Sequence, residues 1–298
     1  MIAYNQVDSN KRKSTLILGF FLVFIIALGW LISYAYDSPI ILLIAIIISV
    51  SQALISYYSG DKIALAVSGA HEIEKKDNPT LWNVVQNLSI TSGLPMPRVY
   101  MINDSAPNAF ATGRDPNHAS VAVTTGLMDR LDKSELEGVI AHEMSHVGNF
   151  DIRLMMIVVV LVGVVSMISD LFLRARFWGF GNNDDNRSGG QLQLILSIVA
   201  ILAAILAPVA AVLIQLSISR KREFLADSSA ALLTRYPEGL ASALEKISIY
   251  TAPMKKVSSA TAHLYIASPT GKKESYISKM FSTHPPIEER IKLLREMA

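Results

Sequence analysis

The 298-residue sequence contains no cysteine, and only 17% of its residues are charged. Without cysteine there can be no disulfide scaffold, no thiolate nucleophile and no cysteine-ligated metal, so a metal ion would need His, Asp or Glu. Lys and Arg number 27 against 25 Asp and Glu, and this near balance gives no reason to expect a nucleic-acid partner. Low charge with 51% hydrophobic residues excludes a disordered chain and favours a membrane protein.

Two uncharged runs of 23 residues flank Asp37 near the N-terminus. A bilayer core needs about 20 apolar residues per helix, so both runs are long enough to span. We predict a transmembrane hairpin over residues 14–59, with a tight turn at Asp37-Ser38-Pro39. The lipid bilayer is therefore an expected partner of this chain.

A second transmembrane hairpin is predicted over residues 154–219. Asp170 lies in its first apolar stretch, and Pro208 interrupts its second, which membrane helices tolerate. The alternative is a buried helix pair within a soluble domain.

Basic residues near the apolar stretches predict the orientation, because Lys and Arg favour the cytoplasmic side. Three precede the first stretch at residues 11–13 and three follow the fourth at residues 220–222, whereas Arg174, Arg176 and Arg187 are a weaker signal in the opposite sense. We therefore expect both termini in the cytoplasm, together with the domain that lies between and after the hairpins. The predicted order is a cytoplasmic N-terminus (1–13), a hairpin (14–59), the first part of a cytoplasmic domain (60–153), a second hairpin (154–219) and the second part of that domain (220–298).

The predicted cytoplasmic segments indicate a small, mainly helical α+β domain. Asn78-Pro79 predicts the start of a helix that ends near Gly93, and Ser134 with Glu137 predicts a capping box for a helix ending near Gly148. Further helices are expected over residues 220–233 and from Pro286. Short β-prone runs predict a small sheet; they are Arg98–Ile102, Ala109–Thr112 and Ser120–Thr124.

The predicted helix before Gly148 contains His142-Glu143-Met144-Ser145-His146, an H-E-x-x-H pattern. Residues i and i+4 of a helix lie on one face, so the imidazoles of His142 and His146 can converge on one Zn²⁺ ion. Glu143 lies beside them, where its carboxylate can act on the attacking water. We interpret this segment as a catalytic zinc helix.

A catalytic zinc site usually takes three protein ligands. The best candidate for the third is Glu223, on the helix predicted after the fourth apolar stretch. Asp227 lies four residues later on the same face, where it could orient a histidine ligand. An exposed acidic pair on a charged juxtamembrane helix is the alternative.

The combination of two N-terminal apolar stretches, AHEMSH, a further apolar pair and SRKREFLAD resembles the HtpX family of membrane zinc endopeptidases, which is related to the CAAX prenyl endopeptidases. The resemblance covers nearly the whole chain. It implies a zincin-like (gluzincin) protease domain, one Zn²⁺ ion, and the plasma membrane of a bacterium. It also implies that Glu223 is the third ligand and Asp227 its support.

Two other segments match the same family. NAFATG, beginning at Asn108, is similar to its substrate-binding edge strand, and THPPIEER, containing His284 and Arg290, is similar to its C-terminal motif. The resemblance implies that Asn108 and His284 donate hydrogen bonds at the tetrahedral centre and that Arg290 is a supporting charge. From the residues alone, Asn108 could equally be a turn residue, and His284 could simply precede the last helix.

The sequence therefore predicts a multi-pass α-helical membrane protein with zinc-dependent endopeptidase activity. The family resemblance implies that it cleaves misfolded or damaged membrane proteins, or other unfolded chains, in protein quality control under stress. Two alternatives remain: a dedicated processing protease for a lipidated or hydrophobic peptide, and a non-catalytic membrane adaptor that binds zinc.

Overall fold

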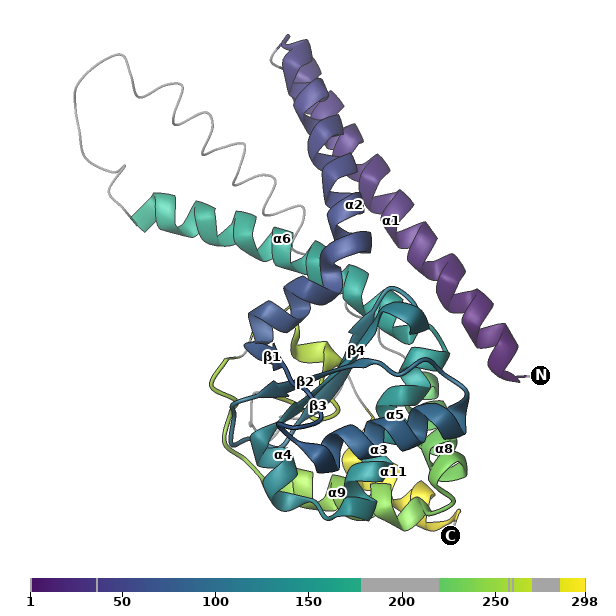
Figure 1. Ribbon diagram of the computed structural model, residues 1–298. Coiled ribbons are helices and arrows are strands. Elements are labelled where there is room, and N and C mark those ends of the chain that lie inside the picture. Colours follow the sequence, from purple (N-terminus) through teal and green to yellow (C-terminus); the bar gives the residue numbers. More distant parts are fainter. Residues whose placement is uncertain are drawn as a thin grey trace.

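The computed structural model describes residues 2–35, 37–177, 220–256, 258, 260–269 and 285–297. The long helices α1, α2 and α6 extend from a folded body of one sheet and several shorter helices (Figure 1). The α-helices are α1 (Ile2–Ala35), α2 (Pro39–Ser68), α3 (Pro79–Ser92), α4 (Thr125–Arg130), α5 (Lys133–Gly148), α6 (Asp151–Phe177), α8 (Arg220–Thr234), α9 (Pro237–Ile249) and α11 (Ile287–Arg295). The strands are β1 (Ala70–Glu72), β2 (Arg98–Ile102), β3 (Ala109–Gly113) and β4 (Ala119–Thr124). Two short 3-10 helices cover Pro116–His118 and Ala262–Leu264.

The first two helices form the predicted hairpin of apolar helices. The segments Val7–Leu31 and Pro39–Ser68 are each long and apolar enough to cross a membrane. Asp37 turns the chain with a φ of 47°, and proline at the first position of α2 suits a helix start. The second helix runs past the expected limit at residue 59 and ends at Gly69, whose left-handed conformation (φ 69°) caps it.

The sheet has the strand order β1-β2-β4-β3, so β3 is an edge strand. The β2–β4 pair is parallel, and the other two pairs are antiparallel. The bond from the Thr124 N–H to the Asn108 carbonyl aligns β3 with its neighbour β4. Because backbone groups alternate along a strand, Ala109, Ala111 and Gly113 turn their N–H and C=O groups to the outer edge. The three predicted strands are therefore confirmed.

Alternate residues of the central strands enter two different cores, because side chains alternate across a sheet. Val99 and Val121 pack with helices of the folded body, including α3, α5 and α9. Tyr100 and Ala122 on the opposite face pack against α1, α2 and the first half of α6. The apolar hairpin therefore packs against the sheet in a common hydrophobic core and is not connected to it by a linker alone.

The helix that carries H-E-x-x-H begins one residue earlier than predicted and uses a different cap. The Asp132 carboxylate accepts from the Glu135 N–H, and the Glu135 side chain accepts from the Asp132 N–H. The predicted capping box of Ser134 with Glu137 is therefore wrong. The Asp132 carboxylate, two residues upstream of Ser134, caps the helix by accepting from the Glu135 N–H, and the Ser134 hydroxyl donates to that carboxylate.

Between α5 and α6 the chain turns by 83° at a short break. Phe150 adopts a left-handed conformation there, with a φ of 59°. The third apolar stretch forms the helix α6, and its first half is buried inside the protein; whether it crosses a membrane remains a prediction. The fourth stretch and the loop before it lie outside the described residues.

Candidate active site

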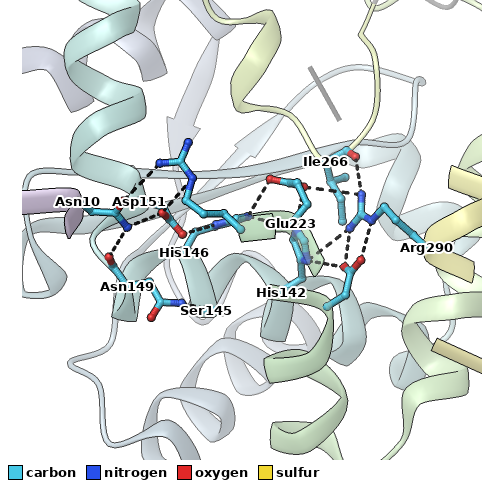
Figure 2. Close-up of polar contacts among 11 residues, drawn as sticks. Asn10, His142, Ser145, His146, Asn149, Asp151, Glu223, Ile266 and Arg290 are labelled. Carbon is cyan, nitrogen blue, oxygen red and sulfur yellow. Dashed lines mark hydrogen bonds and ion pairs between the residues drawn. The ribbon is translucent and has the colours of Figure 1, made fainter. Parts of the chain in front are cut away.

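Three potential metal ligands converge between α5 and α8 (Figure 2). The Nε2 atoms of His142 and His146 are 3.2 Å apart. The carboxylate oxygens of Glu223 lie 3.8 Å from the first nitrogen and 3.7 Å from the second. Ligands at about 2.0–2.1 Å from a tetrahedral ion are roughly 3.3–3.4 Å from one another. The three residues therefore form a group that could hold a metal ion.

The ring nitrogen of His142 that points away from the other two potential ligands, Nδ1, faces a buried carboxylate. Its Nδ1 lies 2.9 Å from Asp227, which in turn accepts a two-pronged ion pair from Arg290, with bonds of 2.8 and 2.7 Å. The Arg290 side chain is fully buried and reaches to 3.9 Å from Glu223. Burial would raise the pKa of Asp227, but the adjacent guanidinium outweighs it and holds the pKa far below its usual range. A permanently charged carboxylate thus fixes the orientation of this imidazole.

The outer nitrogen of His146 faces a second carboxylate, which the sequence reasoning missed. Its Nδ1 lies 3.0 Å from Asp151. The other oxygen of Asp151 accepts from the Asn10 side chain at 2.6 Å and lies 3.6 Å from Arg222. The left-handed turn at Phe150 brings the first residue of α6 back beside the end of α5. An acidic residue five positions after the second histidine, just past a helix-ending Gly-Asn pair, was the signal available in the sequence.

Glu143 is buried beside the proposed ligands and accepts a hydrogen bond from the Ala111 backbone N–H on the edge strand β3. Burial raises the pKa of this carboxyl, and the charge of Glu223 adds to the effect, although the two histidines oppose it. A carboxylate with a raised pKa accepts and returns a proton more readily near neutral pH.

The electrostatics of the cluster favour a divalent cation. Four carboxylates (Glu143, Asp151, Glu223 and Asp227) face two guanidinium groups (Arg222 and Arg290), all less than 5% exposed. With both imidazoles neutral, the cluster therefore carries a formal charge of −2. Burial alone would lower the pKa of His146, but the bond to Asp151 and the nearby negative charges outweigh it and raise the pKa to about 9. The residues thus fit a metal ion with two positive charges.

Asn108 lies at the start of β3 and is directed towards a different partner. Its Nδ2 donates to the Ala267 carbonyl at 2.9 Å, and its Oδ1 accepts from the Ala267 N–H at 3.2 Å. The neighbouring Ile266 N–H donates to the Ala109 carbonyl at 3.0 Å, so this segment covers one end of the strand edge. The second Nδ2–H of Asn108 faces the Met254 sulfur at 3.7 Å, so a role as a donor at the reaction centre would require one of these two contacts to open. His284 lies outside the described residues.

Comparisons with known proteins agree with this geometry. Residues 75–298 match the model of "Peptidase family M48". The chain is 49% identical over 296 residues to "Protease HtpX homolog" of Tropheryma whipplei (strain TW08/27), covering 99% of this chain and 98% of that protein. The chain belongs to the HtpX group of peptidase family M48. A second HtpX homologue, from Caldanaerobacter subterraneus subsp. tengcongensis, is 43% identical and covers 99% and 97% of the two chains.

As an M48 peptidase, the protein is a membrane metalloprotease, which confirms the resemblance found in its sequence. The fold is shared with the crystal structure of S. mikatae Ste24p, with a TM-score of 0.50 at 18% identity. That likeness covers 98% of this chain and 67% of the other.

Proposed function

We propose that this protein is a zinc-dependent endopeptidase that cleaves misfolded or damaged membrane proteins on the cytoplasmic face of a bacterial plasma membrane. The observation that carries the proposal is the convergence of His142, His146 and Glu223 beside the buried carboxylate of Glu143. Two imidazoles and one carboxylate are a ligand set typical of catalytic zinc. Such a site leaves one position open for chemistry, which suits hydrolysis better than a structural role.

Zinc bound here would supply a Lewis acid for the scissile carbonyl and would acidify a water molecule. Glu143 takes the proton from the attacking water and later delivers it to the leaving amine. Its raised pKa suits both steps, because the group must first accept a proton and then release it. His284 and Asn108 remain our candidates for hydrogen-bond donors to the oxyanion.

The edge of β3 supports an extended mode of substrate binding. An extended peptide can add to an exposed edge through backbone hydrogen bonds, which require no particular side chains. Since the 266–267 segment occupies the edge at Ala109, the adjoining Ala111–Gly113 stretch is our candidate for the docking edge. The Ala111 N–H already donates to Glu143, so a peptide on this stretch would pair with the Ala111 carbonyl and with Gly113, and it would lie next to the catalytic carboxylate.

The choice of substrate and side follows from the membrane hairpin. The basic run at residues 11–13 favours a cytoplasmic N-terminus, and Asn10 just before it contacts Asp151 beside the metal group. A protease anchored this way would meet cytoplasmic loops and ends of membrane proteins. Backbone-directed binding accepts unfolded segments of varied sequence, which is what a quality-control role in a stress response requires.

The test compares Glu143→Gln with the wild-type protein in metal content and in cleavage of an unfolded membrane protein. The variant should keep its zinc, because Glu143 is not among the proposed ligands, and should lose at least about 100-fold in cleavage rate. The matched control is Glu137→Gln on the partly exposed side of the same helix, which should cleave normally. Full cleavage by the zinc-loaded Glu143→Gln variant would refute the mechanism.

Two further measurements separate the remaining alternatives. Glu223→Ala should lower the zinc content sharply; an unchanged content would show that Glu223 is not a ligand. A panel containing unfolded membrane proteins and lipidated peptides then tests the substrate class. Cleavage restricted to the lipidated peptides would favour a dedicated processing protease, and no chelator-sensitive cleavage of any substrate would favour a non-catalytic adaptor.

A further inference from the structure

Asn10 is a fully buried polar residue near the N-terminal end of α1. It lies outside the segment that matches the M48 model, which begins at residue 75. Buried residues of α1 recur at positions 10, 14, 17 and 21, the spacing of one helical face. Ile17 and Phe21 on this face pack into the core shared with α6. This face of α1 therefore makes a polar contact through Asn10 near its N-terminal end and apolar contacts through Ile17 and Phe21 further along.

The amide of Asn10 joins three segments that surround the metal group. Its Nδ2 donates to Asp151 at 2.6 Å and to the Asn149 carbonyl at 2.9 Å. Its Oδ1 accepts from Arg222 at 3.4 Å. Figure 2 shows this contact at the opposite end of the cluster from Arg290. One side chain of the membrane hairpin thus bonds to the start of α6 and to the residue that precedes Glu223 on α8.

The consequence for His146 follows from the two oxygens of Asp151. One oxygen faces the Nδ1 of the imidazole, while the other accepts from Asn10. A carboxylate held at both oxygens cannot rotate away from the ring, and the orientation of a histidine ligand depends on such a partner. Because Asn10 is neutral, it fixes Asp151 without cancelling the negative charge that attracts the imidazole.

We propose that Asn10 is a positioning residue that couples the α1–α2 hairpin to the metal site through Asp151 and His146. A displacement of α1 relative to α6 changes the support of one ligand, so the hairpin determines the affinity and geometry of the site as well as its location. This inference rests on the proposed metal site and adds to it a residue outside the protease domain.

The test uses Asn10→Leu in the full-length protein, because leucine has a similar volume but no amide. The matched control is Ser14→Ala on the same buried face, where the hydroxyl donates within its own helix, to the Asn10 carbonyl. The metal-free proteins are titrated with Zn²⁺ against a chromophoric chelator, and their Co²⁺ forms are compared by visible absorption. Asn10→Leu should weaken zinc binding by about 10-fold and alter the cobalt spectrum. Ser14→Ala should change neither.

A double-mutant comparison separates positioning from general destabilisation. If Asn10 acts through Asp151, then Asn10→Leu should have no further effect on zinc affinity in an Asp151→Ala background. Asn10→Gln keeps an amide at this position, so this single variant should bind Zn²⁺ more tightly than Asn10→Leu and less tightly than the wild-type protein. In peptide cleavage, Asn10→Leu should lower kcat and leave KM unchanged, because the bonds of Asn10 go to Asn149, Asp151 and Arg222 and not to a residue of the proposed docking edge.

Three results would decide against the inference. They are equal zinc affinities in Asn10→Leu and Ser14→Ala, an unchanged cobalt spectrum, and additive effects of the Asn10 and Asp151 substitutions. If Asn10→Leu does not fold, Asn10→Gln and Asn10→Ser provide the same comparison with polar side chains. A wild-type protein that binds no Zn²⁺ would refute the proposed function and this inference together, whereas normal wild-type binding with an unaffected Asn10 variant would refute the inference alone.

Discussion

Removal of the metal should make the stability of this protein depend on pH through His146. Nearby negative charges raise the pKa of this buried imidazole to about 9 in the folded chain, against about 6.5 in an unfolded chain. The folded state therefore binds the proton more tightly. Its contribution to stability is fully present below about pH 6.5 and is lost as the pH rises through about 9.

The size of the effect follows from the difference between the two pKa values. A difference of about 2.5 units corresponds to roughly 3 kcal/mol of unfolding free energy. His146 is only 5% exposed, so solvent screening reduces this value little. For a chain of this size, the midpoint of thermal unfolding should fall by roughly 5 °C.

The assay records thermal unfolding of the metal-free protein from pH 6 to 10, with zinc-loaded protein in parallel. Zinc-loaded protein should not show this fall, because a ligand imidazole is neutral. His146→Gln, measured without metal, removes the titrating group and reports the contribution of all other groups. If metal-free wild type and His146→Gln lose stability equally between pH 6.5 and 9, the electrostatic reasoning about this cluster is wrong.

Three further predictions concern stability, each measured by thermal unfolding. Arg290→Ala leaves the buried carboxylate of Asp227 without its cation and should lower the free energy of unfolding by about 3–5 kcal/mol. Arg295→Ala removes exposed ion pairs and should lower it by less than about 1 kcal/mol, so equal losses in the two variants would contradict this reasoning. Gly138→Ala puts a methyl group 2.6 Å from a backbone nitrogen of α9 and should lower the free energy of unfolding by about 1–3 kcal/mol. Gly163→Ala, whose methyl group would meet no described atom within 4 Å, should leave the stability unchanged or raise it. Asn78→Ala removes the cap of α3 and should cost about 1 kcal/mol, so an unchanged midpoint would argue against the cap.

The metal-binding group could be predicted from the sequence because its main element is local. The spacing of His142 and His146 places both imidazoles on one face of a helix, and the structure brings Glu223 to them. The strands and most helix starts were likewise predictable from β-prone runs and from capping residues such as Asn78. The predicted capping box of α5 is wrong because the sequence offers two such boxes, two residues apart. Asp132 and Ser134 are each followed three residues later by a glutamate, and the structure uses Asp132 with Glu135.

The supports of the ligands were harder to predict because they depend on tertiary structure. Asp151 reaches His146 only through the left-handed turn at Phe150, a conformation that phenylalanine rarely adopts. Asn10 is 141 residues from its partner Asp151 and lies in a segment that reads simply as the start of a membrane helix. Nothing in the sequence around Ile266 indicated that its N–H would donate to the edge of β3.

The sharp turn between α5 and α6 has a further consequence for where substrates are cut. Asp151 opens α6, supports a metal-binding histidine and contacts the end of a candidate membrane span. The reaction centre is thereby held at one height relative to the bilayer surface. Peptides that leave the bilayer near the enzyme should be cleaved at a nearly constant number of residues from their last helical turn inside the membrane. The distance from the bilayer, and not the local sequence, would then determine the cleavage site.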